Sequence, residues 1–165
     1  MYLGYRLGHI RNDGRVFRAL VSHKGALTLH MLRKLIGDDA FFRGVRRFYA
    51  TWRFKKAGTE DVKAAFEAES GRNLNLYFER WIYGSSLPRL KFTYTTDPGG
   101  VNVRLEQIGE RFEYPVTVTI KYAATSFDVT VPVTEQVTTQ RIPTTGPPRG
   151  VDINEDDAAP VIFVR

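Results

Sequence analysis

Residues 77–96, YFERWIYGSSLPRLKFTYTT, contain the point at which the sequence changes its secondary-structure pattern. Apolar residues before Gly84 recur at helical spacing, whereas those after Pro88 alternate with polar residues. Because proline disfavours the α conformation of the residue before it, Leu87-Pro88 marks the boundary. We therefore predict an α+β chain. Residues 1–88 form a helical bundle segment, and residues 89–165 form an immunoglobulin-like antiparallel β-sandwich domain.

The charge distribution changes at the same boundary. Residues 1–88 hold 16 Lys and Arg against 8 Asp and Glu, whereas residues 89–165 hold 8 against 10. The chain of 165 residues has a net charge of +6 and is long enough for one domain or two small ones. The two halves therefore differ in charge as well as in patterning.

Four helices of two to four turns are predicted in the first half. Residues 25–36 read as a buried helix, and Asp38 or Asp39 is placed to cap the next one. In that second helix Phe41, Val45, Phe48 and Trp52 share one face, with arginines opposite. A third helix starts at Thr59 and stops at Gly71, and a fourth runs from Asn73 as cap to Gly84 as the residue after its end.

The second half has about seven short segments of strand character, with turn sequences between them. An example is residues 116–121, where Val and Ile alternate with Thr and Lys, which predicts one buried and one wet sheet face. The Asp97-Pro98-Gly99-Gly100 and Gly146-Pro147-Pro148 stretches have turn chemistry. Seven strands at this spacing favour a small sandwich over a barrel.

A search for catalytic chemistry finds little. The chain has no cysteine, which excludes disulfides, thiolate zinc sites and cysteine nucleophiles, and it has no H-E-x-x-H pair. His23 and His30 are seven residues apart with no third ligand in pattern; we expect His30 to be packed or hydrogen-bonded and His9 to lie in a surface loop. Ser22 is not in a nucleophile elbow. The sequence predicts no metal ligands and no catalytic residues.

Basic residues gather near aromatic ones between residues 43 and 56. Nucleic-acid binding uses such a combination. Here the aromatic residues have core periodicity and the arginines lie on the opposite side of the helix. We therefore expect a solvated face, or a face docked on an acidic neighbour, and no nucleic acid.

The order of the helical motifs carries a family resemblance. Residues 24–49, KGALTLHMLRKLIGDDAFFRGVRRFY, and residues 57–88, AGTEDVKAAFEAESGRNLNLYFERWIYGSSLP, resemble the part of aminopeptidase N-like zinc metallopeptidases, the gluzincin type, that follows the zinc site. That family has a Y-x-K-G element, an iG-[DE]-x-x-F turn, a T-x-[ED]-D helix start and a closing F-x-x-W-[IVL]-Y helix, with a β-sandwich next. The resemblance spans residues 2–88 strongly and 89–165 loosely.

The resemblance has implications for the site. The family's zinc ligands and the motif that reads the substrate amine would lie before Met1. The tyrosine of Y-x-K-G, which stabilises the oxyanion, is replaced here by Ser22, within Ser22-His23-Lys24-Gly25. Serine is too short to reach the same oxygen, and loss of one such donor puts about 3 kcal/mol of transition-state stabilisation at stake. Ser22, His23 and Lys24 are substrate-pocket candidates, and His23 is an alternative donor.

The resemblance implies that the chain is the C-terminal fragment of a larger peptidase. It would contribute scaffold and pocket wall without being catalytically complete, and the full-length parent would bind zinc. Its partners would be the remainder of the parent and the parent's peptide substrate, without nucleic acid or membrane. Two alternatives are a non-catalytic protein-interaction module and an inactive peptidase homologue. No stretch reaches the roughly 20 apolar residues that cross a bilayer, so we expect a soluble protein, cytoplasmic or secreted/periplasmic depending on residues before Met1.

Overall fold

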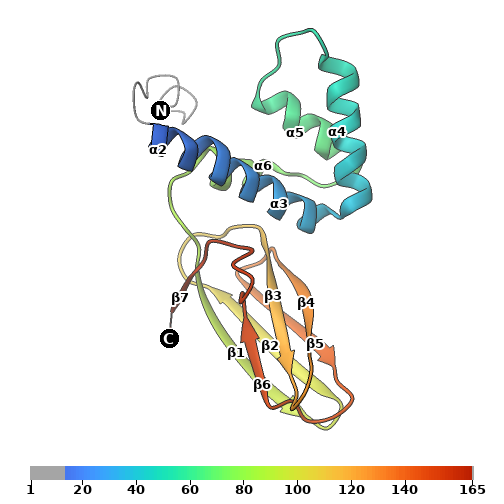
Figure 1. Ribbon diagram of the computed structural model, residues 1–165, viewed down its shortest axis with the longest axis vertical. Coiled ribbons are helices and arrows are strands. Elements are labelled where there is room, and N and C mark those ends of the chain that lie inside the picture. Colours follow the sequence, from blue (N-terminus) through green and yellow to red (C-terminus); the bar gives the residue numbers. More distant parts are fainter. Residues whose placement is uncertain (1–13, 165) are drawn as a thin grey trace. The chain divides into compact units, whose positions relative to one another are not determined.

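The computed structural model describes residues 14–164, which form two compact units (Figure 1). The helical unit extends to Ser85, and the sheet unit begins at Ser86. His9 and the lead-in residues 2–8 of the family resemblance lie outside the described residues. The interpretation of residues 1–88 as the end of a catalytic domain stays a prediction.

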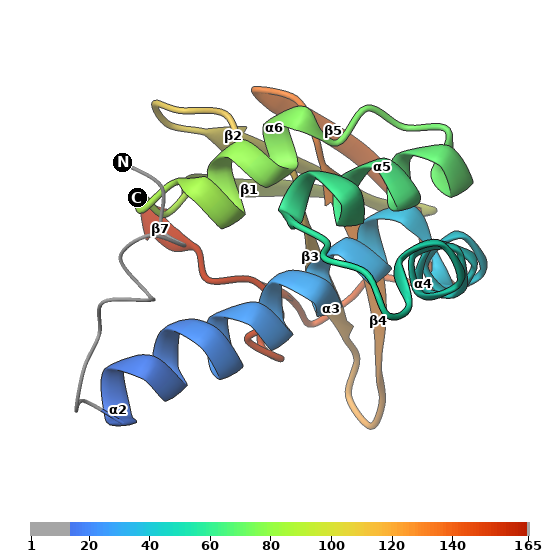
Figure 2. The same cartoon turned by 90° about the horizontal axis from the view of Figure 1, so that it is seen from above.

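The helical unit contains the helices that the sequence predicts, with some changes at their ends. In order these are α2 (Gly14–Phe17), the π-helical turn η1 (Arg18–His23), α3 (Lys24–Ile36), α4 (Asp38–Trp52), α5 (Thr59–Ser70), α6 (Asn75–Phe78) and the π-helical turn η2 (Glu79–Tyr83). In Figures 1 and 2, α5 returns beside α4 after the turn at residues 53–58. No helix among the residues described is long and apolar enough to cross a membrane.

The ends of these helices show which capping predictions were right. Gly71 follows α5 at φ 66°, the left-handed conformation that favours glycine. The cap predicted at Asp38 or Asp39 is wrong, because Gly37 is the N-cap of α4 and Asp38 instead binds Arg33 at 2.6 Å. Both aspartates lie in the first turn of α4, where negative charge stabilises a helix. Gly84 follows η2 in an extended conformation rather than a left-handed one.

The predicted apolar face of α4 is partly wrong. The buried residues of α4 are Ala40 and Gly44, whereas Val45 is exposed and Trp52 only half-buried. The reason is the close approach of α5: a Cβ on Gly44 would lie 2.4 Å from Cδ1 of Phe66. Helix α4 therefore packs against α5 through its small residues. A search for apolar periodicity in the sequence gives small residues the least weight.

The core of the helical unit forms between α3 and the α6–η2 segment. Met31, Leu32, Leu74, Tyr77 and Trp81 are almost inaccessible to solvent. The hydroxyl of Tyr77 donates a hydrogen bond to the backbone oxygen of Thr28 at 2.5 Å, and burial raises the pKa of Tyr77 well above its usual range. These contacts join segments about 50 residues apart in the sequence.

The sheet unit has all seven predicted strands, in two sheets. These are β1 (Arg89–Asp97), β2 (Gly100–Gln107), β3 (Tyr114–Lys121), β4 (Ser126–Val133), β5 (Val137–Pro143), β6 (Gly150–Ile153) and β7 (Ile162–Val164). The sheets have the orders β5-β2-β1-β7 and β4-β3-β6. The prediction of purely antiparallel sheets is wrong for one pair, because β7 runs parallel to β1, with Leu90 opposite Phe163.

The central strand β3 also corrects a prediction. Val116, Val118 and Ile120 are fully buried as expected, but the alternate residues Thr117 and Thr119 are buried too. Their hydroxyls donate to carboxylates, Thr117 to Asp156 and Thr119 to Asp128, each at 2.8 Å. Acidic side chains from neighbouring segments thus cover the face of β3 that the alternating pattern predicts to be exposed to solvent.

Candidate functional site

The predicted pocket residues lie where η1 meets α3. Ser22 and His23 are exposed, and Lys24 is half-buried. The Lys24 ammonium donates to the backbone oxygen of Gly84, 3.3 Å away and 60 residues later in the sequence. Burial lowers the pKa of Lys24 from its ordinary value. This hydrogen bond connects the start of α3 with the residue that follows η2. The assignment of Ser22, His23 and Lys24 to a substrate pocket stays a prediction.

A cleft opens one helical turn after Ser22. It has a volume of about 490 Å³. Apolar residues from four segments form most of its wall: Leu29 and Leu32 of α3, Phe48 of α4, Val62 of α5, and Phe78 with Ile82 near the end of the unit. Gly25 also lines this cleft, so the Ser22–Gly25 segment lies beside its opening. Tyr77 also lines the cleft, and its hydroxyl is already bound to Thr28. This cleft can hold an apolar group, and its lining includes the hydroxyl-bearing residues Thr28, Thr59 and Tyr77 but no carboxylate, imidazole or amine.

The serine and the histidines of the helical unit do not form a catalytic group. No histidine or carboxylate among residues 14–164 forms a hydrogen bond with the Ser22 hydroxyl, so none of these residues is placed to activate it as a base. His30, predicted to be packed or hydrogen-bonded, is exposed on α3. In the part of the chain described here, no three His, Cys, Asp or Glu side chains lie close enough to hold a metal ion. These residues therefore do not fit the zinc that the family resemblance implies for the parent.

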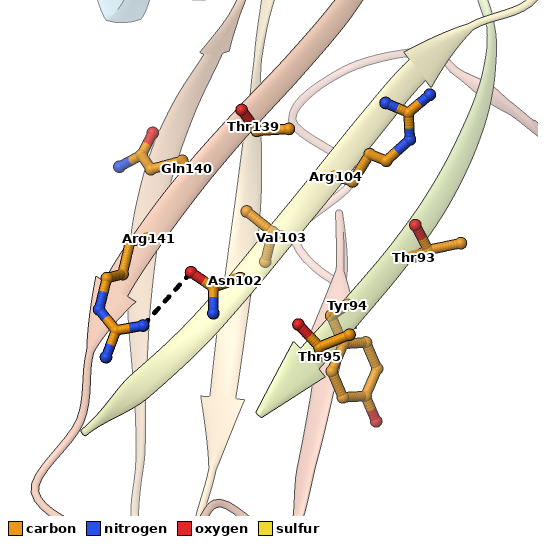
Figure 3. Close-up of a pocket in the computed structure, with 9 residues that line it drawn as sticks. All are labelled: Thr93, Tyr94, Thr95, Asn102, Val103, Arg104, Thr139, Gln140 and Arg141. Carbon is orange, nitrogen blue, oxygen red and sulfur yellow. Dashed lines mark hydrogen bonds between the residues drawn. The ribbon is translucent and has the colours of Figure 1, made fainter. Parts of the chain in front are cut away.

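A second hollow, of about 430 Å³, lies on the outer face of the four-stranded sheet (Figure 3). Thr93, Arg104 and Thr139 form one row across β1, β2 and β5, and the strand register places them opposite one another. Both arginines of the hollow have acidic partners: Arg104 binds Glu106 and Arg141 binds Asp97, each at 2.8 Å. The hollow is a hydroxyl-rich surface whose charges are neutralised, and it contains no nucleophile with an adjacent base.

Sequence reasoning named the Ser22–Lys24 segment but missed the cleft beside it. Four segments that are distant in sequence line that cleft, so no local motif marks it. The signal that was available is Leu29, an apolar residue that the helix leaves 46% exposed.

Comparisons with known proteins find similarity to the same family that the motifs resemble. Residues 5–81 match the Peptidase family M1 domain. The chain is 31% identical to an aminopeptidase N of Streptomyces lividans over 85 residues, which are 52% of this chain and 10% of that protein. It is 29% identical to the Tricorn protease-interacting factor F2 of Thermoplasma volcanium over 115 residues, 64% of this chain and 14% of that protein.

A solved structure extends the likeness to the sheet unit. The crystal structure of Legionella pneumophila aminopeptidase A in complex with aspartic acid matches with a TM-score of 0.75 and 18% identity. The match covers 90% of this chain and 19% of that one, and at this identity it shows the fold alone. The chain thus spans between a tenth and a fifth of the length of these relatives.

Proposed function

We propose that this chain, a fragment-sized relative of the M1 aminopeptidases, is the C-terminal segment of a zinc aminopeptidase to which it contributes scaffold and pocket wall. The observation that carries the proposal is the M1 match over residues 5–81, which includes the helices from α2 to α6 and the first part of η2. The fold likeness that continues through the sheet unit supports the same reading.

The side chains support a scaffold role rather than catalysis by this chain alone. Lys24 donates a hydrogen bond to Gly84, and the described residues offer neither a base for Ser22 nor a metal site. In the parent, Ser22 and His23 would face the substrate from the turn beside the apolar cleft, and residues outside this chain would supply the zinc ligands.

The sheet unit would serve as an immunoglobulin-like sandwich next to the catalytic domain. Each sheet has one row of fully buried residues, such as Val103 and Leu105 of β2, and Val116 and Val118 of β3. Two sheets packed through these rows would bury both apolar faces at once.

The test uses two proteins: this chain, and the longer polypeptide that includes the residues encoded upstream of Met1. We expect stoichiometric zinc and hydrolysis of aminoacyl p-nitroanilides by the longer protein only, with the activity lost when residues 1–88 are deleted. Turnover by the chain alone, or upstream residues that encode no M1 segment, would contradict the proposal.

Substitution of Ser22 in the longer protein distinguishes an active peptidase from an inactive homologue. A phenol that donates to the developing oxyanion accelerates the reaction more than it aids substrate binding. In the longer protein, Ser22→Tyr should raise kcat about 100-fold with little change in KM. If the wild-type protein already turns over at ordinary enzyme rates and Ser22→Tyr slows it, another group such as His23 fills this role. A protein that binds zinc and hydrolyses nothing before or after the change is an inactive homologue.

A further inference from the structure

Helix α4 displays apolar residues on the side that faces away from α5. Phe42, Val45 and Tyr49, which we name the α4 stripe, are 42%, 41% and 66% exposed. Their spacing of three and four residues places them in one row along the helix. Ala40 and Gly44, the buried residues of α4, lie on its other side. The α4 stripe is therefore a second apolar face that the described residues leave without cover.

Phe54, two residues after the end of α4, adds a further exposed aromatic ring to this part of the chain. Its side chain is 94% exposed, the largest value among the exposed apolar residues described. Its backbone has φ 61°, a left-handed conformation that a bulky residue rarely adopts. The exposed ring and the left-handed backbone each cost free energy. A partner that covers the ring would offset the cost of its exposure to water.

Two arginines of α4 and its C-terminal end, Arg46 and Arg53, have no acidic partner among the described residues. Arg43 and Arg47, on the side of α4 that meets α5, share the carboxylate of Glu69. By contrast, Arg46 and Arg53 lie beside Phe42 and Tyr49, and no carboxylate of residues 14–164 forms an ion pair with either. An apolar row flanked by unneutralised arginines fits an apolar row flanked by carboxylates, which arginine binds through two parallel hydrogen bonds.

Two guanidinium groups that lie over aromatic rings of this surface also restrict which other molecules could bind to it. Arg33 lies 5.0 Å from the ring centre of Phe42, and Arg53 lies 5.1 Å from that of Phe54. Each ring thus has one face occupied by a cation, which leaves less ring surface for stacking of nucleic-acid bases. The same contacts keep charge at the level of the rings, so these rings cannot enter the acyl region of a membrane without desolvating an arginine.

We propose that the α4 stripe and Phe54 dock an amphipathic helix whose apolar row is flanked by Asp and Glu, and that this helix belongs to the part of the peptidase outside this chain. The inference rests on the proposed function for the identity of the helix. The row of Phe42, Val45 and Tyr49 has the spacing by which one helix packs against another. The relatives, of which this chain spans between a tenth and a fifth, are long enough to supply such a helix.

Because the chain contains no cysteine, one introduced thiol can report on the surface. In Tyr49→Cys we expect rapid maleimide labelling in this chain and labelling at least 10-fold slower in the longer protein, each rate normalised to the denatured protein. The matched control is His30→Cys, because His30 is exposed on α3 outside the α4 stripe. It should be labelled at the same rate as Tyr49→Cys in this chain. Equal rates for Tyr49→Cys in both proteins would overturn the proposal.

Charge reversal tests the acidic nature of the partner. Arg46→Glu combined with Arg53→Glu should restore labelling of Tyr49→Cys in the longer protein at least 5-fold. Lys34→Glu, an exposed lysine of α3, should leave it unchanged. Labelling that responds equally to both reversals would show a partner without complementary charge and would contradict the proposal.

A membrane is the competing occupant, and this chain alone tests it. Vesicles of 30% phosphatidylserine in phosphatidylcholine should not sediment the chain. Sedimentation that Tyr49→Ser with Phe54→Ser abolishes, together with unprotected Tyr49→Cys in the longer protein, would assign the surface to lipid. These outcomes do not depend on zinc or hydrolysis. The aminoacyl p-nitroanilide assay therefore decides the proposed function independently.

Discussion

The two units of this chain bury their apolar residues to different degrees. In the sheet unit, Leu90, Leu105 and Val118 are completely inaccessible, and β3 is buried on both of its faces. In the helical unit, Leu29 lies at the edge of an open cleft and Tyr49 and Phe54 stand out in solvent. Both units leave some large apolar side chains exposed, such as Ile162 and Phe163 in the sheet unit. The difference lies in their central elements, because β3 is buried along almost its whole length whereas α4 buries only Ala40 and Gly44. This difference is what the proposed docking of a further helix on the α4 stripe would explain.

Trp81 tests how firmly the helical unit is held together despite its open surfaces. It is 2% exposed, so Trp81→Ala should lower the free energy of unfolding by about 3–5 kcal/mol. Half-buried Trp52 is the control, and Trp52→Ala should cost about 1 kcal/mol. Urea unfolding followed by circular dichroism gives both values. Equal costs would mean that the helical unit has no core of its own.

A pair of leucines sharpens the comparison between the units. Leu105 in β2 is 0% exposed, and Leu105→Ala should cost about 2–5 kcal/mol because it leaves a cavity in a closed core. Leu29 is 46% exposed, so Leu29→Ala should lower the free energy of unfolding by less than about 1 kcal/mol. Thermal unfolding of the two variants measures the difference. A large cost at Leu29 in this chain alone would show that the cleft is closed in solution.

Gly44 tests the contact between α4 and α5. A Cβ at this position would meet the ring of Phe66 at 2.4 Å, and Phe66 is itself buried and stacked on Phe41. Gly44→Ala should therefore destabilise the helical unit by about 1–3 kcal/mol. Gly25→Ala is the matched control, because no atom lies within 4 Å of its Cβ position, and it should stabilise by about 0.4–1 kcal/mol. Tryptophan fluorescence during urea unfolding reports on this unit, since Trp52 and Trp81 both belong to it.

The smallest expected effect concerns acid stability of the sheet unit. The hydrogen bonds of Asp97 with Arg141 and with the backbone N–H of Gly99 hold the pKa of this carboxyl well below its usual range. Because the pKa of Asp97 is lower in the folded state than its unfolded-state value near 4, the ionised carboxylate stabilises the folded state at pH values above 4. This stabilisation is lost progressively as the pH falls from 4 towards the folded-state pKa. The melting temperature of Asp97→Asn should therefore drop less between pH 7 and pH 3 than that of the wild-type chain. Because the pair is exposed, high salt should shrink the difference, and a salt-independent difference would contradict this assignment.

Much of the fold could be predicted because its signals are local. The alternation from Val116 to Ile120 and the turn at Asp97–Gly100 place strands regardless of what surrounds them. Burial of Thr117 was not predictable in this way, because Asp156 reaches it from 39 residues later in the sequence. The parallel pairing of β7 with β1 is also a contact between distant segments.

The candidate site was less predictable for the same reason. The position of Ser22 could be recognised from the motif, but the contact of Lys24 with Gly84 depends on how η2 folds back. The exposed stripe on α4 was missed because Phe42, Val45 and Tyr49 look like core residues in a sequence. Which apolar row faces inward was decided by Gly44, the residue that lets α5 approach.

The short pairing of β7 with β1 brings the two ends of the sheet unit together. The backbone N–H of Ile162 donates to the oxygen of Pro88 at 2.9 Å, and Arg89 pairs with Ile162. Adjacent ends of this kind permit circular permutation. A short linker from Val164 to Pro88, with a new opening in the exposed turn at Pro98-Gly99, should preserve both sheets. The sheet unit could then be transplanted into a surface loop of another protein as an inserted cassette.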